Sequence, residues 1–411
     1  MDTPVDDDAV SAGGGPLAGL TVVAIEQAVS APLCSRTLGD LGARVVKIEN
    51  PSTGDFARHY DDVVHGQSAH FAWLNRNKES LALDVKSERG QEVLHRLLER
   101  ADVLVSNLAP GTTSRYGLAP SQLAQRHPDL IAVEIDGFGP GGPLSHKRAY
   151  DLLAQAESGS CAITGFPGTP AKAGPPVADL CTGLYSAISV LALLVGRGSG
   201  RAGGAVAVSL FDTMTELMGY ALTYTRYTGI DQEPVGMGSP AVAPYGSYLT
   251  ADGHTVVLGT TNDREWQRLA LGILDRPDLA ADSRFATTAS RVAHRSVLDA
   301  EIGQWCAQHD LAQIQEIADN AGIGNSRLNL PSEVLSHPHL LARDRFRTIS
   351  TPTGPAEAVL PPPVIAGYTP PMGAVPGLGE HTDAVLTELG LSELEIAALR
   401  EQGAIGPSYI R

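Results

Sequence analysis

The sequence contains little cysteine and few basic residues. Its four cysteines, Cys34, Cys161, Cys181 and Cys306, form no CxxC pair and no dense spacing, which favours free thiols in a reducing compartment over a disulfide framework. Lysine and arginine number 30 against 46 acidic residues, so the formal net charge is −16. Nucleic acid and anionic membranes both reward a basic surface, and this composition therefore argues against either as a partner.

Long hydrophobic runs are also missing. The longest, around 187–195, is shorter than the roughly 20 apolar residues that a membrane-spanning helix needs. The first residues are acidic, which is the wrong charge for a secretory signal. We therefore expect a cytoplasmic protein, with residues 1–15 forming a flexible, glycine-rich tail.

Several well-known site motifs are absent. No Gly-x-Gly-x-x-Gly opens a helix after the first predicted strand, and there is no phosphate-loop Lys-Ser/Thr motif or Gly-x-Ser-x-Gly elbow. His337 and His339 lack acidic neighbours, a pattern more typical of surface than of a metal site. The sequence predicts no metal and no permanently bound cofactor.

What is present is an alternation of short apolar strands and helices in the first half of the chain. Strands are predicted at 20–25, 44–49, 80–85, 102–106, 130–136 and 205–210, with helical patterns between them. This order indicates an α/β fold with a doubly wound, Rossmann-like parallel sheet. Ligands of such sheets bind at the carboxyl ends of the strands.

The character of the sequence changes after about residue 235. Alternating strands at 245–250 and 254–260, followed by helical patterns, indicate a smaller α+β domain. The predicted organisation is a large domain at 16–198 and 392–411, a linker at 199–235, a small domain at 236–325 and a second linker at 326–391. Both linkers are predicted from their glycine and proline content.

Asp179 admits two interpretations. It comes just before a long apolar pattern at 180–195, so it is a natural helix N-cap that accepts backbone N–H bonds. The same place would keep a carboxylate ionised through the helix dipole, as a nucleophile requires. The apolar helix itself is expected to be buried, because its pattern is apolar all round. Local pattern does not choose between cap and nucleophile.

Several motifs, in a fixed order along the chain, carry a family resemblance that favours the nucleophile over the helix cap. They are Leu38–Glu49, Asn75–Asp84, Asp102–Asn107, Pro110–Gly111, Tyr150–Ala156, Ala178–Gly183 and Gly379–Thr382. In these motifs the chain resembles the family III CoA-transferases, the group of formyl-CoA transferase and carnitine CoA-transferase. The resemblance implies that Asp179 attacks an acyl-CoA thioester, giving an aspartyl anhydride and then an aspartyl-CoA thioester. It also implies long linkers and an interlocked homodimer.

The resemblance further implies a set of coenzyme A contacts. They are Val29, Ser30, Leu83, Asp84, Val85, Lys86, Asn107, Leu108, Ala109, Arg115, Lys147, Arg148, Ala149 and Tyr150. The four cations among them are suitable phosphate partners in an otherwise acidic chain. One basic position of the family, just after the second strand, is occupied here by Asn50, which puts one expected contact in doubt.

Tyr150 separates two activities within the superfamily. The related α-methylacyl-CoA racemases have a catalytic histidine at this position, and tyrosine, whose ordinary pKa is about 10, is a poor base at neutral pH. Transfer of coenzyme A to a short-chain, dicarboxylic acid, with succinyl-CoA as a possible donor, is therefore predicted over racemisation. A non-catalytic acyl-CoA binding protein is a third alternative, which the presence of Asp179 disfavours. Arg264 and Arg327 are candidates to bind a second carboxylate.

Overall fold

The computed structural model describes residues 14–200 and 203–407, so the tail predicted at 1–15 falls almost wholly outside the described residues. Internal contacts divide the chain into two compact units. The large unit comprises the described parts of residues 1–158, 175–217 and 343–411, and the small unit comprises residues 159–174 and 218–342. The domain and linker boundaries drawn from the sequence stay a prediction.

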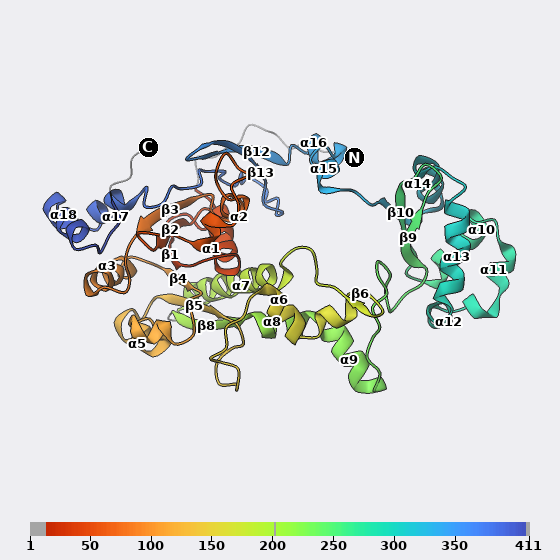
Figure 1. Ribbon diagram of the computed structural model, residues 1–411, viewed down its shortest axis with the longest axis horizontal. Coiled ribbons are helices and arrows are strands. Elements are labelled where there is room, and N and C mark those ends of the chain that lie inside the picture. Colours follow the sequence, from red (N-terminus) through yellow and green to blue (C-terminus); the bar gives the residue numbers. More distant parts are fainter. Residues whose placement is uncertain (1–13, 201–202, 408–411) are drawn as a thin grey trace. The chain divides into compact units, whose positions relative to one another are not determined.

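A six-stranded parallel sheet forms the centre of the large unit, in the order β3-β2-β1-β4-β5-β8 (Figure 1). Its strands are β1 (Thr21–Ile25), β2 (Arg44–Glu49), β3 (Lys78–Ala82), β4 (Val103–Ser106), β5 (Ile131–Asp136) and β8 (Gly204–Ser209). From β1 the chain adds β2 and β3 on one side of the sheet, and then β4, β5 and β8 on the other side. Strand β1 pairs in parallel with both β2 and β4. The α/β fold class predicted from the sequence is confirmed.

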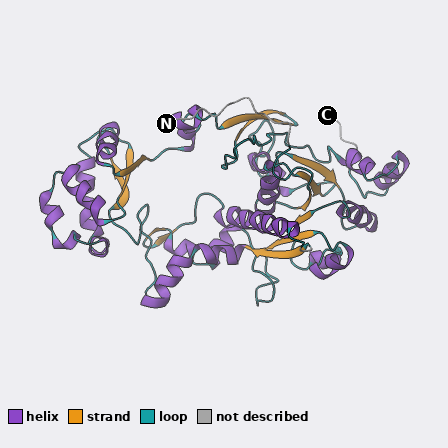
Figure 2. Ribbon diagram, turned by 180° about the vertical axis from the view of Figure 1, so that it is seen from behind, coloured by secondary structure: helices purple, strands orange, loops and turns teal. Residues whose placement is uncertain are grey.

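Alternating side chains on the strands bury both faces of this sheet. Val23 and Ile25 face a core shared with α3 (Glu88–Leu98), α17 (Thr382–Glu388) and α18 (Glu393–Glu401). Val22 and Ala24 face the opposite core, which includes α1 (Ser30–Asp40) and α7 (Val177–Gly198). Helices therefore cover both faces, and the strands are apolar on both sides, as buried parallel strands are (Figure 2).

Helix α7 departs from its sequence prediction in length and burial. It begins at Val177 rather than at 180, and it is the one described helix that is long and apolar enough to cross a membrane. It packs along α1, yet only 33% of its most apolar stretch is buried. Ile188 and Val195 are 58% and 75% exposed. The expectation of complete burial was wrong, because an apolar composition does not determine which faces of a helix are covered.

Shorter elements complete the large unit. They are α2 (Ala69–Leu74), α4 (Thr112–Arg115), α5 (Pro120–Arg126), α6 (Asp151–Glu157), α8 (Leu210–Leu217) and the hairpin of β12 (Phe346–Thr351) and β13 (Gly354–Val359), with a 3-10 turn at Phe56–His59. The stretches predicted as linkers thus contain regular structure, β8 and α8 in the first and the β12–β13 hairpin in the second. Backbone pairing formed there in spite of the glycine and proline content.

The small unit contains a three-stranded antiparallel sheet of β9 (Tyr245–Leu249), β10 (Thr255–Gly259) and β11 (Gly324–Arg327). The β9–β10 hairpin lies where the sequence predicted alternating strands. The sheet packs against helices around the buried Trp266. The remaining elements are β6 (Gly165–Phe166), β7 (Thr169–Pro170), α9 (Gly219–Thr228), α10 (Asp263–Gly272), α11 (Pro277–Ala281), α12 (Thr288–Ala293), α13 (Arg295–Cys306), α14 (Leu311–Ala321), α15 (Pro331–Val334) and α16 (Pro338–Ala342), with 3-10 turns at Ser160–Ile163 and Ser283–Phe285.

Candidate active site

A pocket of about 780 Å³ opens at the carboxyl ends of the parallel strands, entirely within the large unit. Its walls are the segments that follow β1, β2, β3, β4 and β5, together with Asp179 of α7. The change of strand order between β1 and β4 separates the loops at this edge, which is where doubly wound sheets bind their ligands. The pocket is large enough for a nucleotide-sized molecule.

All but one of the residues predicted from the family resemblance lie in this pocket. Its lining includes Asp179, Ser30, Leu83, Asp84, Val85, Lys86, Asn107, Leu108, Ala109, Arg115, Lys147, Arg148, Ala149 and Tyr150. Val29 is the exception: it is buried beside Leu33 and Leu74 and packs into the protein interior. The fold thus gathers segments that are up to 150 residues apart, and their contact with coenzyme A stays a prediction.

Asp179 is the third residue of α7, inside the first turn rather than at the cap. The hydroxyl of Ser30, the first residue of α1, donates a hydrogen bond of 2.8 Å to its Oδ1. One turn later, Gly183 allows α7 to approach this point closely, since a Cβ there would lie 2.4 Å from the carbonyl oxygen of Ser30. The close packing of α1 on α7 therefore fixes the donor and acceptor of this bond.

The capping role considered for Asp179 belongs to another carboxylate. The Oδ1 atom of Asp151, at the start of α6, accepts the backbone N–H of Ala178 at 2.9 Å. Its Oδ2 atom accepts from Gln155 at 2.7 Å, which fixes the side chain. The N-cap position itself, Pro176, has no side-chain cap bond. Asp179 is therefore not needed as a cap, and the cap interpretation was wrong.

Burial raises the pKa of Asp179 to about 6, the hydrogen bond from Ser30 opposes this rise, and the negative charge of Asp151 adds to it. The sequence had suggested that the helix dipole keeps this carboxylate fully ionised. Desolvation has the largest effect on its pKa here, because the protein around it removes much of the water from the carboxylate. A carboxylate with such a pKa is ionised at neutral pH but is poorly solvated, which increases its reactivity as a nucleophile.

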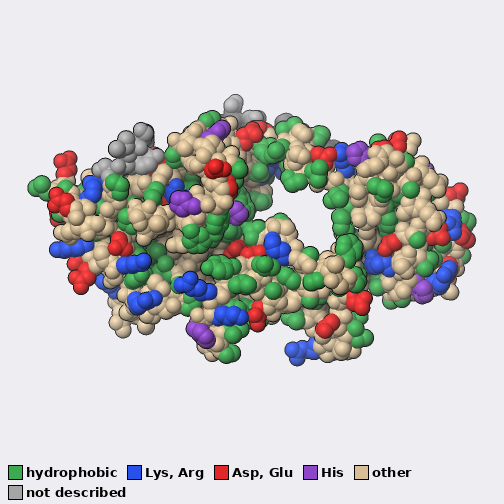
Figure 3. All heavy atoms as spheres, viewed as in Figure 1, with side chains coloured by type: hydrophobic (Ala, Val, Ile, Leu, Met, Phe, Trp, Pro, Cys, Tyr) green, Lys and Arg blue, Asp and Glu red, His purple; other side chains and the backbone are tan. Residues whose placement is uncertain are grey.

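Four cations line the pocket, as predicted. Lys86, Arg115, Lys147 and Arg148 are all exposed. Lys147 approaches Glu157 at 3.6 Å, whereas no ion pair with a carboxylate joins the other three within residues 14–200 and 203–407. Basic side chains are visible on this part of the large unit, near α5 and the loop that precedes α6 (Figure 3). Exposed cations of this kind are available to bind a polyanion.

Asn50 has a structural role in place of the missing cation. Its Oδ1 accepts the N–H groups of Ser52 and Thr53 at 2.9 and 3.1 Å, which closes the turn after β2. This turn also lines the pocket. The next arginine along the chain, Arg58, donates two hydrogen bonds to Glu49.

Two residues of this region were not singled out by the sequence. Tyr60 is half exposed, and burial together with the charges of Asp55, Asp179 and Tyr150 raises its pKa, so it lies within electrostatic range of Asp179. Gln27 lines the pocket, and both its backbone N–H and C=O are bonded to Asn107. Neither lies in a regular element with a recognisable pattern, so no periodicity could have identified them.

The fold and the pocket together define the class of protein. A doubly wound sheet, a nucleotide-sized pocket with exposed cations, and a half-buried carboxylate of raised pKa in its lining are features of an enzyme that binds an anionic ligand and uses a carboxylate on it. No dinucleotide-binding glycine motif accompanies this sheet, so resemblance of the fold alone does not define the reaction.

Comparison with known proteins defines the family. The model of CoA-transferase family III matches residues 17–382, and the chain belongs to this family of CoA-transferases. It is 31% identical to a succinyl-CoA–D-citramalate CoA-transferase of Chloroflexus aurantiacus over 95% of this chain and 98% of that protein. It is 32% identical to a succinyl-CoA:mesaconate CoA-transferase of Haloarcula hispanica, over 92% and 97% of the two chains. Identity to an acetyl-CoA:oxalate CoA-transferase of Acetobacter aceti is also 32%, over 92% and 97%.

Comparison with solved structures supports the same family assignment. A CaiB/BaiF family protein from Brucella suis is 31% identical and superimposes with a TM-score of 0.79, covering 92% of this chain and all of that one. A Mycobacterium tuberculosis protein is 27% identical with a TM-score of 0.80, over 90% and 99% of the chains. The family resemblance predicted from the sequence motifs is confirmed.

Proposed function

We propose that this CoA-transferase moves coenzyme A between an acyl-CoA and a short dicarboxylate, with Asp179 as the nucleophile. The observation that carries the proposal is the half-buried Asp179 carboxylate that lines the pocket and accepts a hydrogen bond from Ser30. Its pKa of about 6 leaves it ionised at neutral pH. The surrounding cations supply sites for the phosphates of coenzyme A.

The proposed reaction conserves the energy of the thioester. The Asp179 carboxylate attacks the thioester carbonyl and expels the CoA thiolate, which leaves a mixed anhydride. The thiolate then attacks the aspartyl carbonyl, releases the first acid as its carboxylate and forms an aspartyl-CoA thioester. The acceptor carboxylate attacks this thioester and again expels the thiolate. Attack of the thiolate on the acceptor's acyl carbon forms the new acyl-CoA and regenerates Asp179.

A dicarboxylic substrate is supported by the relatives, two of which are named for succinyl-CoA with citramalate or mesaconate. The candidates for binding its second carboxylate differ in availability. Arg327 is already paired with Glu333 in the small unit, whereas Arg264 is exposed on α10. Within the large unit the exposed pocket cations are further candidates.

A second copy of the chain is the proposed partner. Three mutually packed helices of the large unit, α6, α7 and α8, each expose large apolar side chains. They are Leu152, Leu153, Leu184, Tyr185, Ile188 and Leu217. Monomeric proteins rarely expose a continuous apolar area of this kind, and a homodimer would cover it.

Incubation with succinyl-CoA and a panel of acids, read by mass spectrometry of the CoA esters, tests the proposed function. We expect new esters with one or more short dicarboxylates. Asp179→Ala should abolish exchange and leave CoA binding intact, because the pocket's cations remain. Exchange that persists in Asp179→Ala would remove this residue from the nucleophile role.

The racemase alternative gives a different result in the same assay. Epimerisation of a 2-methylacyl-CoA without formation of any new ester would contradict CoA transfer and favour the racemase. Binding of acyl-CoA with neither reaction would instead favour a non-catalytic binding protein.

A further inference from the structure

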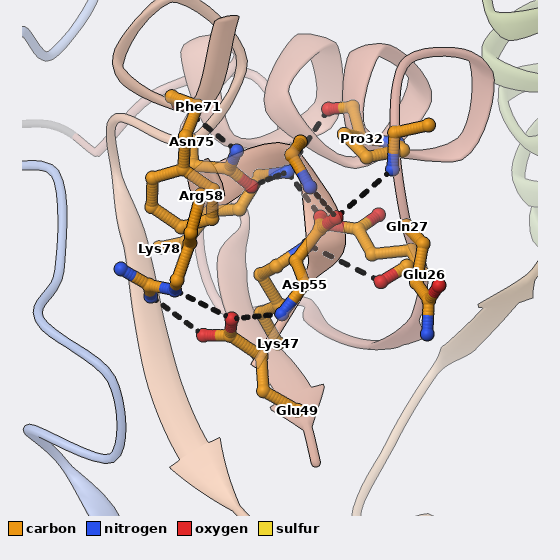
Figure 4. Close-up of polar contacts among 12 residues, drawn as sticks. Glu26, Gln27, Pro32, Lys47, Glu49, Asp55, Arg58, Phe71, Asn75 and Lys78 are labelled. Atoms are coloured by element: carbon orange, nitrogen blue, oxygen red, sulfur yellow. Dashed lines mark hydrogen bonds and ion pairs between the residues drawn. The ribbon is translucent and has the colours of Figure 1, made fainter. Parts of the chain in front are cut away.

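A buried ionic cluster lies beneath the loop that joins β1 to α1 (Figure 4). It contains three acidic and three basic side chains, and five of the six are completely inaccessible to solvent. The members are Glu26, Lys47, Glu49, Asp55, Arg58 and Lys78. Opposite charges balance within the cluster. The cost of desolvating buried charges offsets most of their mutual attraction, so such a cluster adds little to the stability of the fold. Its contacts with the loop therefore give a better indication of its role.

Asp55 joins this cluster to the loop. Its Oδ2 atom accepts from the ammonium group of Lys47 at 2.8 Å. Its Oδ1 atom accepts the backbone N–H groups of Ala28 and Ala57 at 3.1 and 2.9 Å. Ala28 has a φ of +64°, a left-handed conformation that is unfavourable for a residue with a Cβ. The carboxylate therefore holds a strained peptide in place.

The strained residue is two positions before Ser30. Between them Val29 is buried, so the chain has little freedom to compensate for movement at Ala28. Ser30 begins α1, and its hydroxyl donates to Asp179 at 2.8 Å. A line of direct contacts thus runs from Lys47 through Asp55 and the backbone of the loop to the nucleophile.

We propose that Asp55 is a positioning residue that holds the Ser30 hydroxyl against Asp179. The inference rests on the proposed function, since it assigns Asp55 to the same reaction. Asp55 belongs to the pocket lining, but its side chain is fully buried, and we do not assign it a contact with the substrate. It fixes the turn at Ala28, and this turn sets the direction in which Ser30 enters α1.

Titration of Asp179 tests the inference without any substrate. We would follow the aspartate carboxyl carbons by NMR in selectively labelled protein and assign Asp179 by its loss in Asp179→Asn. Ser30→Ala should raise the pKa of Asp179, because the hydrogen bond from Ser30 lowers it. Asp55→Asn should raise it too if it displaces the same hydroxyl. In the double variant, Asp55→Asn should add nothing to the effect of Ser30→Ala.

The sign of the change separates positioning from direct electrostatics. Removing a nearby negative charge would by itself lower the pKa of Asp179, whereas loss of the Ser30 bond raises it. The other titratable groups near Asp179 include Asp151 and Tyr60. Those around Asp55 include Lys47, Lys78, Glu26, Glu49 and Tyr60. An unchanged or lowered pKa in Asp55→Asn, an unchanged pKa in Ser30→Ala, or additive effects in the double variant would overturn the inference.

Asp40→Asn is the matched control. Asp40 is another buried carboxylate of the large unit, paired with Arg76 and bonded to Asn77, and it makes no contact with the loop. Asp40→Asn should lower the free energy of unfolding about as much as Asp55→Asn does, and it should leave the pKa of Asp179 unchanged. If Asp55→Asn does not fold, Asp55→Glu keeps the charge but moves the carboxylate by one methylene. It should also raise the pKa of Asp179, and a pKa that stays at the wild-type value would contradict positioning.

Kinetics give a second measurement. We expect Asp55→Asn to slow acylation by roughly tenfold to a hundredfold in a single turnover, with CoA binding little changed, because misplacement of reacting groups affects the chemical step most. An absence of CoA transfer in the wild-type protein would overturn the proposed function and leave the titration result intact. The two failures are thus distinguishable.

Discussion

A carboxylate that is to attack a thioester must be ionised and yet poorly solvated, and these requirements oppose each other. In the proposed reaction Asp179 would meet both requirements, because burial raises its pKa while one hydrogen bond from Ser30 limits the rise. Asp151 accepts the backbone N–H of Ala178 in the first turn of α7, so Asp179 is not needed for that bond. At the scale of single residues, two neighbouring carboxylates thus have different roles: Asp151 accepts a backbone N–H of α7, and Asp179 is the proposed nucleophile.

The rate of acylation should therefore depend on pH with a known sign. Only the ionised form of Asp179 attacks, and its pKa is about 6, so the rate should rise with pH through about 6 and then level off. Single-turnover acylation by an acyl-CoA, measured from about pH 5 to pH 8, checks this. Circular dichroism at each pH controls for unfolding. A rate that falls as pH rises over this range would contradict a carboxylate nucleophile.

At the scale of elements, the contact between α1 and α7 determines the geometry of the site. Gly183 is a point of close approach, because a Cβ there would lie 2.4 Å from the backbone oxygen of Ser30 and 3.1 Å from the Cβ of Leu33. Backbone atoms at such a distance must move, because no side-chain rotation relieves the contact. The same contact positions the donor of the Asp179 hydrogen bond.

Gly183→Ala should therefore affect both stability and activity. We expect a loss of about 1–3 kcal/mol in the free energy of unfolding, as for other overpacked sites, together with slower acylation. Urea denaturation and single-turnover kinetics measure the two effects. Gly198→Ala is the control: it makes the same change on the same helix, at a position with no atom within 4 Å. If the two variants have the same stability and the same acylation rate, the close contact of α7 with α1 at Gly183 does not control the site, and the prediction is contradicted.

At the scale of the whole molecule, the exposed apolar helices predict self-association. Light scattering should give about 86 kDa, which is twice the chain mass of 43.0 kDa. Ile188→Lys should weaken the dimer, because it places a charge on the exposed face of α7. Leu394→Lys, which changes an exposed leucine on α18 outside the three apolar helices, should leave the mass unchanged. A wild-type mass near 43.0 kDa would contradict the homodimer.

Local sequence determined much of the large unit. The strand from 44 to 49 was predicted with its observed ends, because a buried β-branched run is a signal confined to a few neighbouring residues. The edge of the sheet at which the pocket opens followed as well, since the carboxyl ends of parallel strands share one edge. The linker boundaries stay a prediction, and the pairing of β12 with β13 inside the second predicted linker is not visible in composition.

The chemistry of the site was decided only by tertiary structure. The sequence motifs singled out Asp179, but its neighbour Ser30 is 149 residues away in the chain, and its competitor for the cap position, Asp151, is on another helix. Its pKa follows from desolvation, which depends on everything packed around it. Periodicity and composition report what a residue's chain neighbours favour. Which side chains lose water together, and which carboxylate is left free to react, is set by the packing of α1, α6 and α7.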